Sequence, residues 1–483
     1  PLGSIALRMN IFSAVVSSLA GLFFFLTIRD RFSSPLSALI PTSFLGLSST
    51  IWSVSNQTEV YALTYLLIAI DLFLYHKRRY HLLAYFLGLT LTNHMIGLSV
   101  VVPIIGFLLI RRRLSLSMII LFLLPLTLYL YLLIRARTSP LLNWGNPETL
   151  ERLIWHLTGK QYRVWMFDLP FTQVVNNLRL ALERLSREFF FFLIPVAIYG
   201  LIQIREDLPL YLAICAINIF YSINYSIPDI ESYFIPSLVV ITIFLGYGLN
   251  RIRFKYLPLL ALLPLIHLPQ NSGKDYHFAD DLAQNILTNM KNRSLLVCNI
   301  WDAYSPLLYY DIVEEKGSEH WIIDKELLRR SWYLNYLKRR YPELCDRLKD
   351  EFQRYEEQLY LFEHDLPYDP DLIQTRFERL IQGIFRASLS DRTAYLLSPI
   401  RDQDLARSLT GMTRRPEGIL LRIGAEAEAF DFNQFIIRIP KKLDPRHHFL
   451  VKSIYLRMAY LNYQNYRSES ALRFYQKLKM RLR

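Results

Sequence analysis

Acidic residues are scarce in the first part of the chain. Only 12 of its 42 Asp and Glu residues lie in residues 1–270, although this segment makes up more than half of the 483 residues. Hydrophobic residues account for 52% of the composition, and apolar runs recur throughout the acid-poor segment. Such a composition excludes an ordinary soluble domain there and is typical of a polytopic α-helical membrane domain. Residues 271–483 hold the remaining acids and are predicted to be soluble.

Cysteine is also rare, and its spacing shows no pattern. Cys215, Cys298 and Cys345 lie far apart, which excludes a disulfide scaffold and a cysteine-based zinc site. No GxxxxGK[ST] phosphate-binding loop occurs, so nucleotide hydrolysis is not expected. The net charge of +13 does not indicate a nucleic-acid partner, because Lys and Arg in the short loops of a membrane protein explain it.

The acid-poor segment contains apolar runs close to the length that crosses a ~30 Å hydrocarbon layer. We predict about ten spans, near residues 11–28, 36–53, 60–76, 81–94, 95–110, 114–134, 188–204, 208–225, 233–249 and 255–268. For residues 81–110, the interruption at Asn93-His94 favours two short helices with a tight turn over one broken helix. Basic clusters fall in alternate loops, which places those loops in the cytoplasm; they include Lys77-Arg78-Arg79, Arg111-Arg112-Arg113 and Arg251/Arg253/Lys255.

The pattern of the chain predicts three parts. Residues 1–270 form the membrane domain, with a long external loop at 135–187 in which Pro147 is expected at the first helical position and Asn146 as its cap. Residues 271–448 read as an external α/β domain, and residues 449–483 as a C-terminal helical hairpin resembling a tetratricopeptide (TPR) hairpin. Strands of the α/β domain are predicted at 294–298, 358–362, 394–397 and 418–423.

Two neighbouring apolar runs carry polar residues at the same ends. Glu59 precedes the run at 60–76 and Asn93-His94 ends the run at 81–94, whereas Lys77-Arg78-Arg79 lies between the two runs. If both runs are membrane helices, Glu59 and Asn93-His94 face the same compartment. A polar group at such a place either lies in the headgroup layer or belongs to a functional site, and we favour the site.

Five stretches resemble, in chain order, motifs of a family of membrane protein O-mannosyltransferases long carried as a domain of unknown function. They are Pro1-Leu-Gly-Ser-Ile-Ala-Leu-Arg8, Trp52 to Glu59-Val-Tyr61, Gly88 to Asn93-His94, Trp144-Gly-Asn-Pro147 to Tyr162, and Tyr225-Ser-Ile-Pro228-Asp229 to Tyr233. The resemblance implies a GT-C-type fold with its active site on the outer membrane face. It further implies a polyprenyl-phosphate sugar as the donor, with mannose as one candidate sugar, and a hydroxyl of an external protein as the acceptor.

The same resemblance places the family's base in a first external loop, which would precede Pro1. The chain as written is therefore expected to lack that loop and its helix and to be inactive or nearly so, since a positioned base contributes ~10²–10⁴-fold. Within the chain, Glu59 is the first candidate for the base and Asp229 the second. The sequence implies no particular cofactor, and it leaves room for a divalent cation bound through Glu59 or the absent acid.

Sugar transfer to a hydroxyl also needs groups that stabilise the departing phosphate and a groove for the lipid. The candidates for binding substrate are Tyr61, Asn93, His94, Arg135, Trp144, His156, Tyr162, Asp229 and Tyr233. For Arg135 and His156, a role as anchors at helix ends is as well supported as a role in binding substrate. For Trp144 and Tyr162, a place in the aromatic belt of the membrane interface is slightly favoured over stacking on sugar.

Other functions remain open at this point. The acceptor could be a glycolipid or polysaccharide, or the chain could be a transporter, a flippase or a non-catalytic scaffold. A transporter predicts internal repeats and polar residues at mid-membrane, whereas here the polar residues gather at one face and no repeat is visible. The sequence therefore favours a multi-pass glycosyltransferase of the bacterial inner membrane, surrounded by membrane lipid, with its C-terminal domain in the periplasm.

Overall fold

The computed structural model describes every residue except 1–2, 33–34, 228, 253–256, 441–442 and 483. Several predicted features therefore lie outside the described residues: Pro1 and Leu2 of the first motif, Pro228 of the last motif, and Arg253 and Lys255 of the last basic loop. The chain divides into two compact units. The first comprises Pro1–Thr138 and Pro147–Gly273, and the second comprises Ser139–Asn146 and Lys274–Arg483.

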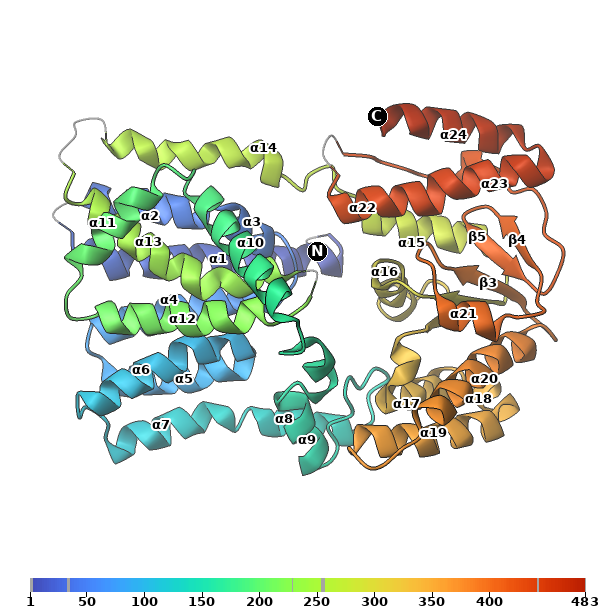
Figure 1. Cartoon of the computed structure of the whole chain (residues 1–483), viewed down its shortest axis with the longest axis horizontal. Coiled ribbons are helices and arrows are strands. Elements are labelled where there is room, and N and C mark those ends of the chain that lie inside the picture. The colour runs from blue at the N-terminus through green and yellow to red at the C-terminus, as the bar shows by residue number, and fades with distance from the viewer. Residues whose placement is uncertain (1–2, 33–34, 228, 253–256, 441–442, 483) are drawn as a thin grey trace. The chain divides into compact units, whose positions relative to one another are not determined.

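The first unit is helical, and most of its helices lie side by side (Figure 1). Its α-helices are α1 (Ile5–Arg29), α2 (Pro35–Gly46), α3 (Ser49–Ser55), α4 (Tyr61–His76), α5 (Tyr80–Asn93), α6 (Leu98–Ile110), α7 (Leu116–Leu126), α8 (Tyr129–Arg137), α9 (Leu150–Leu157), α10 (Phe171–Glu188), α11 (Ile194–Gln203), α12 (Leu208–Ile223), α13 (Ile235–Leu249) and α14 (Leu268–Asn271). Short 3₁₀ segments join them: η1 (Met95–Gly97), η2 (Lys160–Trp165), η3 (Ile230–Phe234) and η4 (Leu257–His267).

Among the described residues of this unit, three stretches are long and apolar enough to cross a membrane: Ile5–Arg29, Leu116–Arg137 and Ile230–Leu249. Shorter apolar helices of 10–17 residues accompany them, among them Tyr61–His76, Met95–Ile110 and Leu208–Ile223. A perpendicular span needs about 20 residues, so the ten predicted spans stay a prediction. The long apolar helices themselves mark the chain as a membrane protein.

Helices α4 and α5 form the antiparallel pair that the sequence predicts. The chain reverses at Lys77-Arg78-Arg79, where Arg78 takes a left-handed conformation with φ 56°. At the other end, His94 is extended (φ −158°, ψ 144°) and ends α5. Its Nδ1 accepts a hydrogen bond from the Ile96 N–H at 3.2 Å, which starts η1 and then α6. The interpretation of residues 81–110 as two helices is thus confirmed.

The segment 147–188 builds two more helices of the first unit. The prediction that α9 begins at Pro147 with Asn146 as its cap is wrong, because Thr149 takes the cap position and its Oγ1 accepts from the Arg152 N–H at 3.2 Å. Helix α10 ends at the buried Glu188, whose carboxylate accepts from the N–H groups of Ser49 at 2.8 Å and Thr50 at 2.9 Å. This carboxylate satisfies free donors at the start of α3 and complements the helix dipole.

The second unit contains a five-stranded sheet of order β2-β1-β3-β5-β4. Its strands are β1 (Ser294–Cys298), β2 (Trp321–Asp324), β3 (Thr393–Leu397), β4 (Arg414–Glu417) and β5 (Leu420–Ile423). Strands β2, β1 and β3 are parallel, whereas β5 and β4 run antiparallel, with Leu296 opposite both Ile322 and Tyr395. Every residue of β1 is buried, as expected for a central parallel strand covered on both faces.

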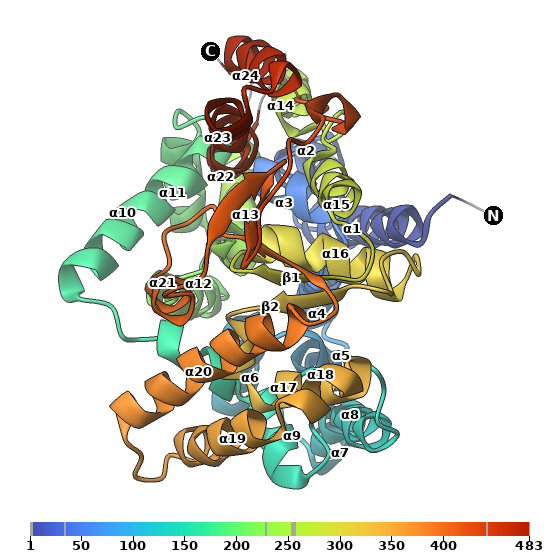
Figure 2. The same ribbon diagram turned by 90° about the vertical axis from the view of Figure 1, so that its right-hand side faces the viewer.

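Helices cover this sheet in two groups, with α17 to α20 on one side and α22 to α24 on the other (Figures 1 and 2). The α-helices of the second unit are α15 (Phe278–Asn289), α16 (Trp301–Ile312), α17 (Ser331–Arg340), α18 (Pro342–Arg347), α19 (Lys349–Glu363), α20 (Pro370–Ser388), α21 (Gln403–Ser408), α22 (Pro445–Leu450), α23 (Arg457–Tyr466) and α24 (Glu469–Arg481). A π-helical segment, Val451–Leu456, joins α22 to α23. The predicted strand at 358–362 is wrong: it lies in α19, where Phe352, Tyr355 and Leu359 are buried at helical spacing.

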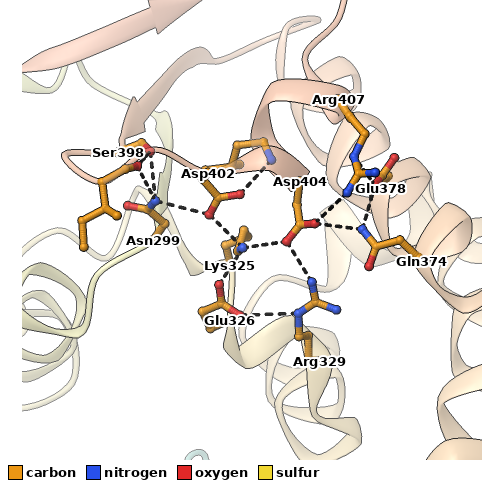
Figure 3. A network of polar contacts seen from close by, with 12 residues as sticks. Asn299, Lys325, Glu326, Arg329, Gln374, Glu378, Ser398, Asp402, Asp404 and Arg407 are labelled. Atoms are coloured by element: carbon orange, nitrogen blue, oxygen red, sulfur yellow. Dashed lines mark hydrogen bonds and ion pairs between the residues drawn. The ribbon is translucent and has the colours of Figure 1, made fainter. Parts of the chain in front are cut away.

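A buried lysine ties the sheet to the helices (Figure 3). Lys325 follows β2, and its side chain is 3% exposed. Its Nζ lies 2.8 Å from a carboxylate oxygen of Asp402 and 2.9 Å from one of Asp404. Asp404 also accepts from Arg329 and Gln374, both at 2.8 Å. A buried charge is tolerated only when it is paired in this way, so this network is a structural joint of the second unit.

Candidate functional site

Six of the predicted site residues gather at one end of α4 and α5 in the first unit. Tyr61 is the first residue of α4, and its hydroxyl donates a hydrogen bond to Asp229 Oδ2 at 3.3 Å. The ring of Tyr61 lies 5.4 Å from that of His94 and 5.7 Å from that of Tyr233, between centroids. The rings of His94 and Tyr233 are 5.3 Å apart. Loops that are far apart in the chain therefore meet in one polar and aromatic cluster.

Asn93 fastens the two helices at this end. Its Nδ2 donates to Val60 O at 3.0 Å and to Thr64 Oγ1 at 2.6 Å. Both amide hydrogens are thus used within the protein, and only Oδ1 stays available to accept a hydrogen bond from a ligand. Asn93 acts mainly as a positioning residue, which sets the direction of the next residue, His94.

One ring nitrogen of His94 is engaged, and the other, Nε2, forms no hydrogen bond with any residue that the structure describes. Because Nδ1 accepts from the Ile96 N–H, a neutral ring carries its hydrogen on Nε2. A donor at Nε2 beside the rings of Tyr61 and Tyr233 suits a sugar hydroxyl or a phosphate oxygen. The tautomer follows here from the hydrogen bond at Nδ1.

Tyr233 is held in place by a residue that the sequence analysis missed. Asn218 of α12 is fully buried, its Nδ2 donates to Tyr233 O at 2.8 Å, and its Oδ1 accepts from Ser237 Oγ at 2.6 Å. An isolated Asn within the apolar run at 208–223 was the available signal, because a polar residue inside a membrane segment requires a partner.

Glu59 supplies a carboxylate that has no fixed partner. The residue lies in the loop before α4, and its carboxyl forms no ion pair or hydrogen bond with any residue in the described part of the chain. The surrounding protein and the negative charge of Asp229 both raise the pKa of the Glu59 carboxyl. Asp229, in contrast, is engaged by Tyr61. The two carboxylates therefore differ: Glu59 is free to accept a proton, and Asp229 is oriented.

The predicted residues of segment 135–187 have different surroundings. The stretch containing Tyr162 is joined to the Tyr225 loop by two backbone contacts. The Ser226 N–H donates to Trp165 O at 3.0 Å, and Met166 pairs with Tyr225 in an isolated antiparallel β-bridge. The Tyr225 ring in turn lies 5.4 Å from that of Tyr233. This stretch therefore borders the cluster, through a tyrosine that the sequence analysis did not single out as a site residue.

Arg135, His156 and Trp144 lie apart from the cluster by their contacts. Arg135 Nη1 donates to Thr138 Oγ1 at 2.7 Å, and His156 is half-buried in α9. Trp144 belongs to the second unit. There its ring lies 4.3 Å from Trp332 and 5.9 Å from Trp301. Hydrogen bonds and ring contacts thus give none of the three a link to the Tyr61–Asp229 pair within the described residues.

A small pocket lies between α10 and α12, and its lining includes Ile230, the residue after Asp229 in the chain. Its volume is about 180 Å³, and Asn177, Ser222, Tyr225 and Ile230 are among its lining residues. Ser222 is 1% exposed, and its Oγ has no hydrogen-bond partner among the described residues. A buried hydroxyl without a partner costs free energy, so a polar group bound here would satisfy it. The volume is below the ~300–1,000 Å³ of drug-sized sites and suits a small group.

The residues of the cluster do not by themselves fit a metal site. Within the described ranges, no group of three or more His, Cys, Asp and Glu side chains is arranged to hold a metal ion. Glu59 and Asp229 would supply two carboxylates, which is only part of the shell that Mg²⁺ or Ca²⁺ requires. The chemistry below is therefore derived from the side chains alone.

Comparison with known proteins supports the motif analysis. Residues 1–118 match the family described as the Protein O-mannosyl-transferase TMEM260 N-terminal domain. No curated protein and no solved structure matches the chain. The matched segment contains Glu59, Tyr61, Asn93 and His94. Residues 1–118 therefore resemble the N-terminal domain of a protein O-mannosyltransferase family, as the motifs of the chain predicted.

Proposed function

We propose that this membrane protein is a glycosyltransferase that moves a sugar from a polyprenyl phosphate to a hydroxyl of an external protein, with mannose as the expected sugar. The observation that carries the proposal is the meeting of Glu59, Asp229 and His94 around Tyr61, at one end of apolar helices. The family match of residues 1–118 supports the reaction class. The donor, the acceptor and the sugar are part of the proposal.

In contrast to the expectation that the chain lacks its base, the proposed reaction gives this role to Glu59, whose carboxylate takes the proton of the acceptor hydroxyl. The acceptor oxygen then forms a bond to the anomeric carbon, while the bond from that carbon to the phosphate oxygen breaks. Polyprenyl phosphate leaves with the bonding electron pair. The raised pKa of Glu59 suits this role, because a general base works best when its pKa lies near the working pH.

The other side chains orient the reactants. His94 Nε2–H would donate to the departing phosphate, whose charge develops as the bond breaks. Asp229, fixed by the Tyr61 hydroxyl, would accept a hydrogen bond from a sugar hydroxyl. The pocket between α10 and α12, which contains the Ser222 hydroxyl that has no partner among the described residues, would take a further hydroxyl of the sugar or the acceptor.

The membrane arrangement follows the distribution of charge. Lys77-Arg78-Arg79 lies at the opposite end of α4 and α5 from Glu59 and His94, so the positive-inside rule puts the cluster on the external face. We place the protein in a bacterial inner membrane, with about ten segments in or across the bilayer and residues 274–483 in the periplasm. The polyprenyl chain of the donor would then lie in membrane lipid beside the site.

The test uses the full chain in membranes, with polyprenyl-phosphate mannose carrying a labelled sugar and a Ser/Thr-containing acceptor peptide. Glu59→Gln is expected to lower transfer by ~10²–10⁴-fold, the contribution of a positioned base. Glu206→Gln is the matched control, since Glu206 is also exposed but lies before α12, at the end away from Glu59. Equal transfer by Glu59→Gln and wild type would contradict the assignment of Glu59 as the base. If the labelled sugar appears only in the lipid fraction, the acceptor is a lipid and not a protein.

A further inference from the structure

The second unit contains a groove lined mainly by arginine. It lies along α19 and α20, next to the end of α18, and has a volume of about 610 Å³. The charged residues that line it are Arg347, Glu351, Arg354, Arg376, Arg379 and Arg386. The groove therefore has five cationic side chains and one acidic side chain, so its charge is strongly positive. We call this feature the arginine groove.

Helical spacing explains why these cations share one face. On α20, Arg376, Arg379, Gly383 and Arg386 follow one another at intervals of three or four residues, which places them on one side of the helix. Gly383 allows α20 to approach Leu348 closely, because a Cβ at this position would lie 3.0 Å from Leu348 Cδ2. The glycine thus lowers the floor of the groove between the arginines.

One arginine of the groove is neutralised and four are not. Arg347 donates to Asp391 Oδ1 at 2.7 Å, and to Ala387 O and Ser390 Oγ at 2.9 Å each. No side-chain hydrogen bond or ion pair joins Arg354, Arg376, Arg379 or Arg386 to any described residue. Several arginines elsewhere in the unit have acidic partners, such as Arg438 with Asp281 and Arg407 with Glu378.

We propose that the arginine groove binds a ligand that carries two or more phosphate groups. Four guanidinium groups without partners repel one another, and a bound polyanion would remove that repulsion. Guanidinium groups match phosphate oxygens in bidentate geometry, and each phosphate brings up to two negative charges. The groove volume falls within the range of small-molecule sites. The phosphates could belong to a lipid headgroup or to a free polyphosphate, since the recognising chemistry is the same.

The test measures binding to the full chain in neutral detergent. The probes are inorganic pyrophosphate, mixed micelles that contain cardiolipin, and phosphatidylcholine micelles as the uncharged comparison. The groove variant is Arg354→Gln/Arg379→Gln/Arg386→Gln. The matched control, Lys452→Gln/Arg457→Gln/Arg473→Gln, removes the same charge from exposed positions of the π-helical segment, α23 and α24. Polyglutamate is a fourth probe, for carboxylates instead of phosphates.

We expect the groove variant to bind pyrophosphate, cardiolipin or both at least about tenfold more weakly than wild type, and the control to stay within about twofold. Binding should weaken as salt is raised, because exposed charges are screened. If pyrophosphate binds more tightly than cardiolipin, the ligand is a free polyphosphate. If cardiolipin binds more tightly than pyrophosphate, the ligand is a lipid headgroup. A groove variant that binds like wild type, no binding of either phosphate probe, or tighter binding of polyglutamate would overturn the proposal.

A second variant guards against misfolding. Replacing the same three arginines by lysine keeps the charge and should leave the fold intact. It is expected to bind several-fold more weakly than wild type, because lysine lacks the bidentate fork of arginine. Sugar transfer is not a readout of this experiment, so its result does not depend on the function proposed for the first unit.

Discussion

The Tyr61 hydroxyl donates a hydrogen bond to Asp229 Oδ2 at 3.3 Å, although the two residues are 168 positions apart. This bond joins the start of α4 to the loop before η3, and Glu59 and His94 lie next to it. It orients one carboxylate of the pair and leaves the other, Glu59, without a partner. The division between an oriented and a free carboxylate is the basis of the proposed chemistry.

Tyr61→Phe removes that bond without removing the ring. Hydrogen bonds to charged groups contribute about 1.5–3 kcal/mol, so we expect transfer to fall by roughly tenfold to a hundredfold if Asp229 acts in the reaction. The aromatic contacts persist, so the Tm should fall by only a few degrees. Tyr131→Phe serves as the control, since Tyr131 is 62% exposed. Unchanged transfer in Tyr61→Phe would mean that the orientation of Asp229 has no part in turnover.

The pH dependence of transfer should report Glu59. The pKa of Glu59 is raised because the surrounding protein partly desolvates its carboxyl and because Asp229 is negatively charged, and the ionised form is the active base. Activity is therefore expected to fall as the pH drops through a value above the ~4.3 of an ordinary glutamate. Asp229→Asn removes the like charge and should move this acidic limb to lower pH. The measurement is kcat/KM as a function of pH. If the acidic limb of Asp229→Asn stays at the wild-type pH, the charge of Asp229 does not raise the pKa of Glu59.

Glu188 supports the helix that leads to Glu59. Glu188→Ala leaves the N–H groups of Ser49 and Thr50 without their acceptor, and each unsatisfied buried donor costs about 1–3 kcal/mol. We expect a lower Tm in detergent and weaker transfer, because the loop after α3 loses its support. Glu183→Ala is the control, since the exposed Arg187 is the only partner of Glu183 among the described residues. Equal Tm values for the two variants would remove Glu188 as a cap of α3.

Lys325→Met tests the joint shown in Figure 3. The substitution leaves Asp402 and Asp404 without the cation between them, and removing one partner of a buried ion pair costs about 3–5 kcal/mol. The second unit should unfold at lower denaturant concentration. Lys349→Met, at an exposed position at the start of α19, should have little effect. Equal denaturation midpoints for both variants would show that the network adds nothing to stability.

The proposed topology predicts that Ser318 and Arg112 lie on opposite sides of the membrane. Both positions are exposed, and Arg112 belongs to a basic loop that the positive-inside rule assigns to the cytoplasm. A membrane-impermeant thiol reagent should label the cysteine of Ser318→Cys from the periplasmic side. It should label the cysteine of Arg112→Cys from the cytoplasmic side. Cys298 and Cys345 are buried and Cys215 is half-buried, so background labelling should be low. Labelling of both variants from one side would refute the topology.

Local sequence determined the features that depend on neighbouring residues. The apolar runs with few acids predicted membrane helices, and Asn93-His94 predicted the break between α5 and α6, where His94 is extended. The run at 294–298 predicted β1, because a fully buried parallel strand is apolar at every position. The run at 358–362 is also mostly apolar but lies in α19, since its neighbours Phe352 and Tyr355 extend a helical pattern that buries Leu359.

Only the tertiary structure decided which distant residues act together. Residue type and spacing marked Glu59, Tyr61 and His94, but nothing in the sequence indicated that Tyr61 would orient Asp229 or that Asn218 would hold Tyr233. The arginine groove likewise exists only because α19 and α20 pack closely at Gly383. Local patterns report the preferences of a short segment, whereas contacts between segments depend on how whole helices pack, and that packing is set by the entire chain at once.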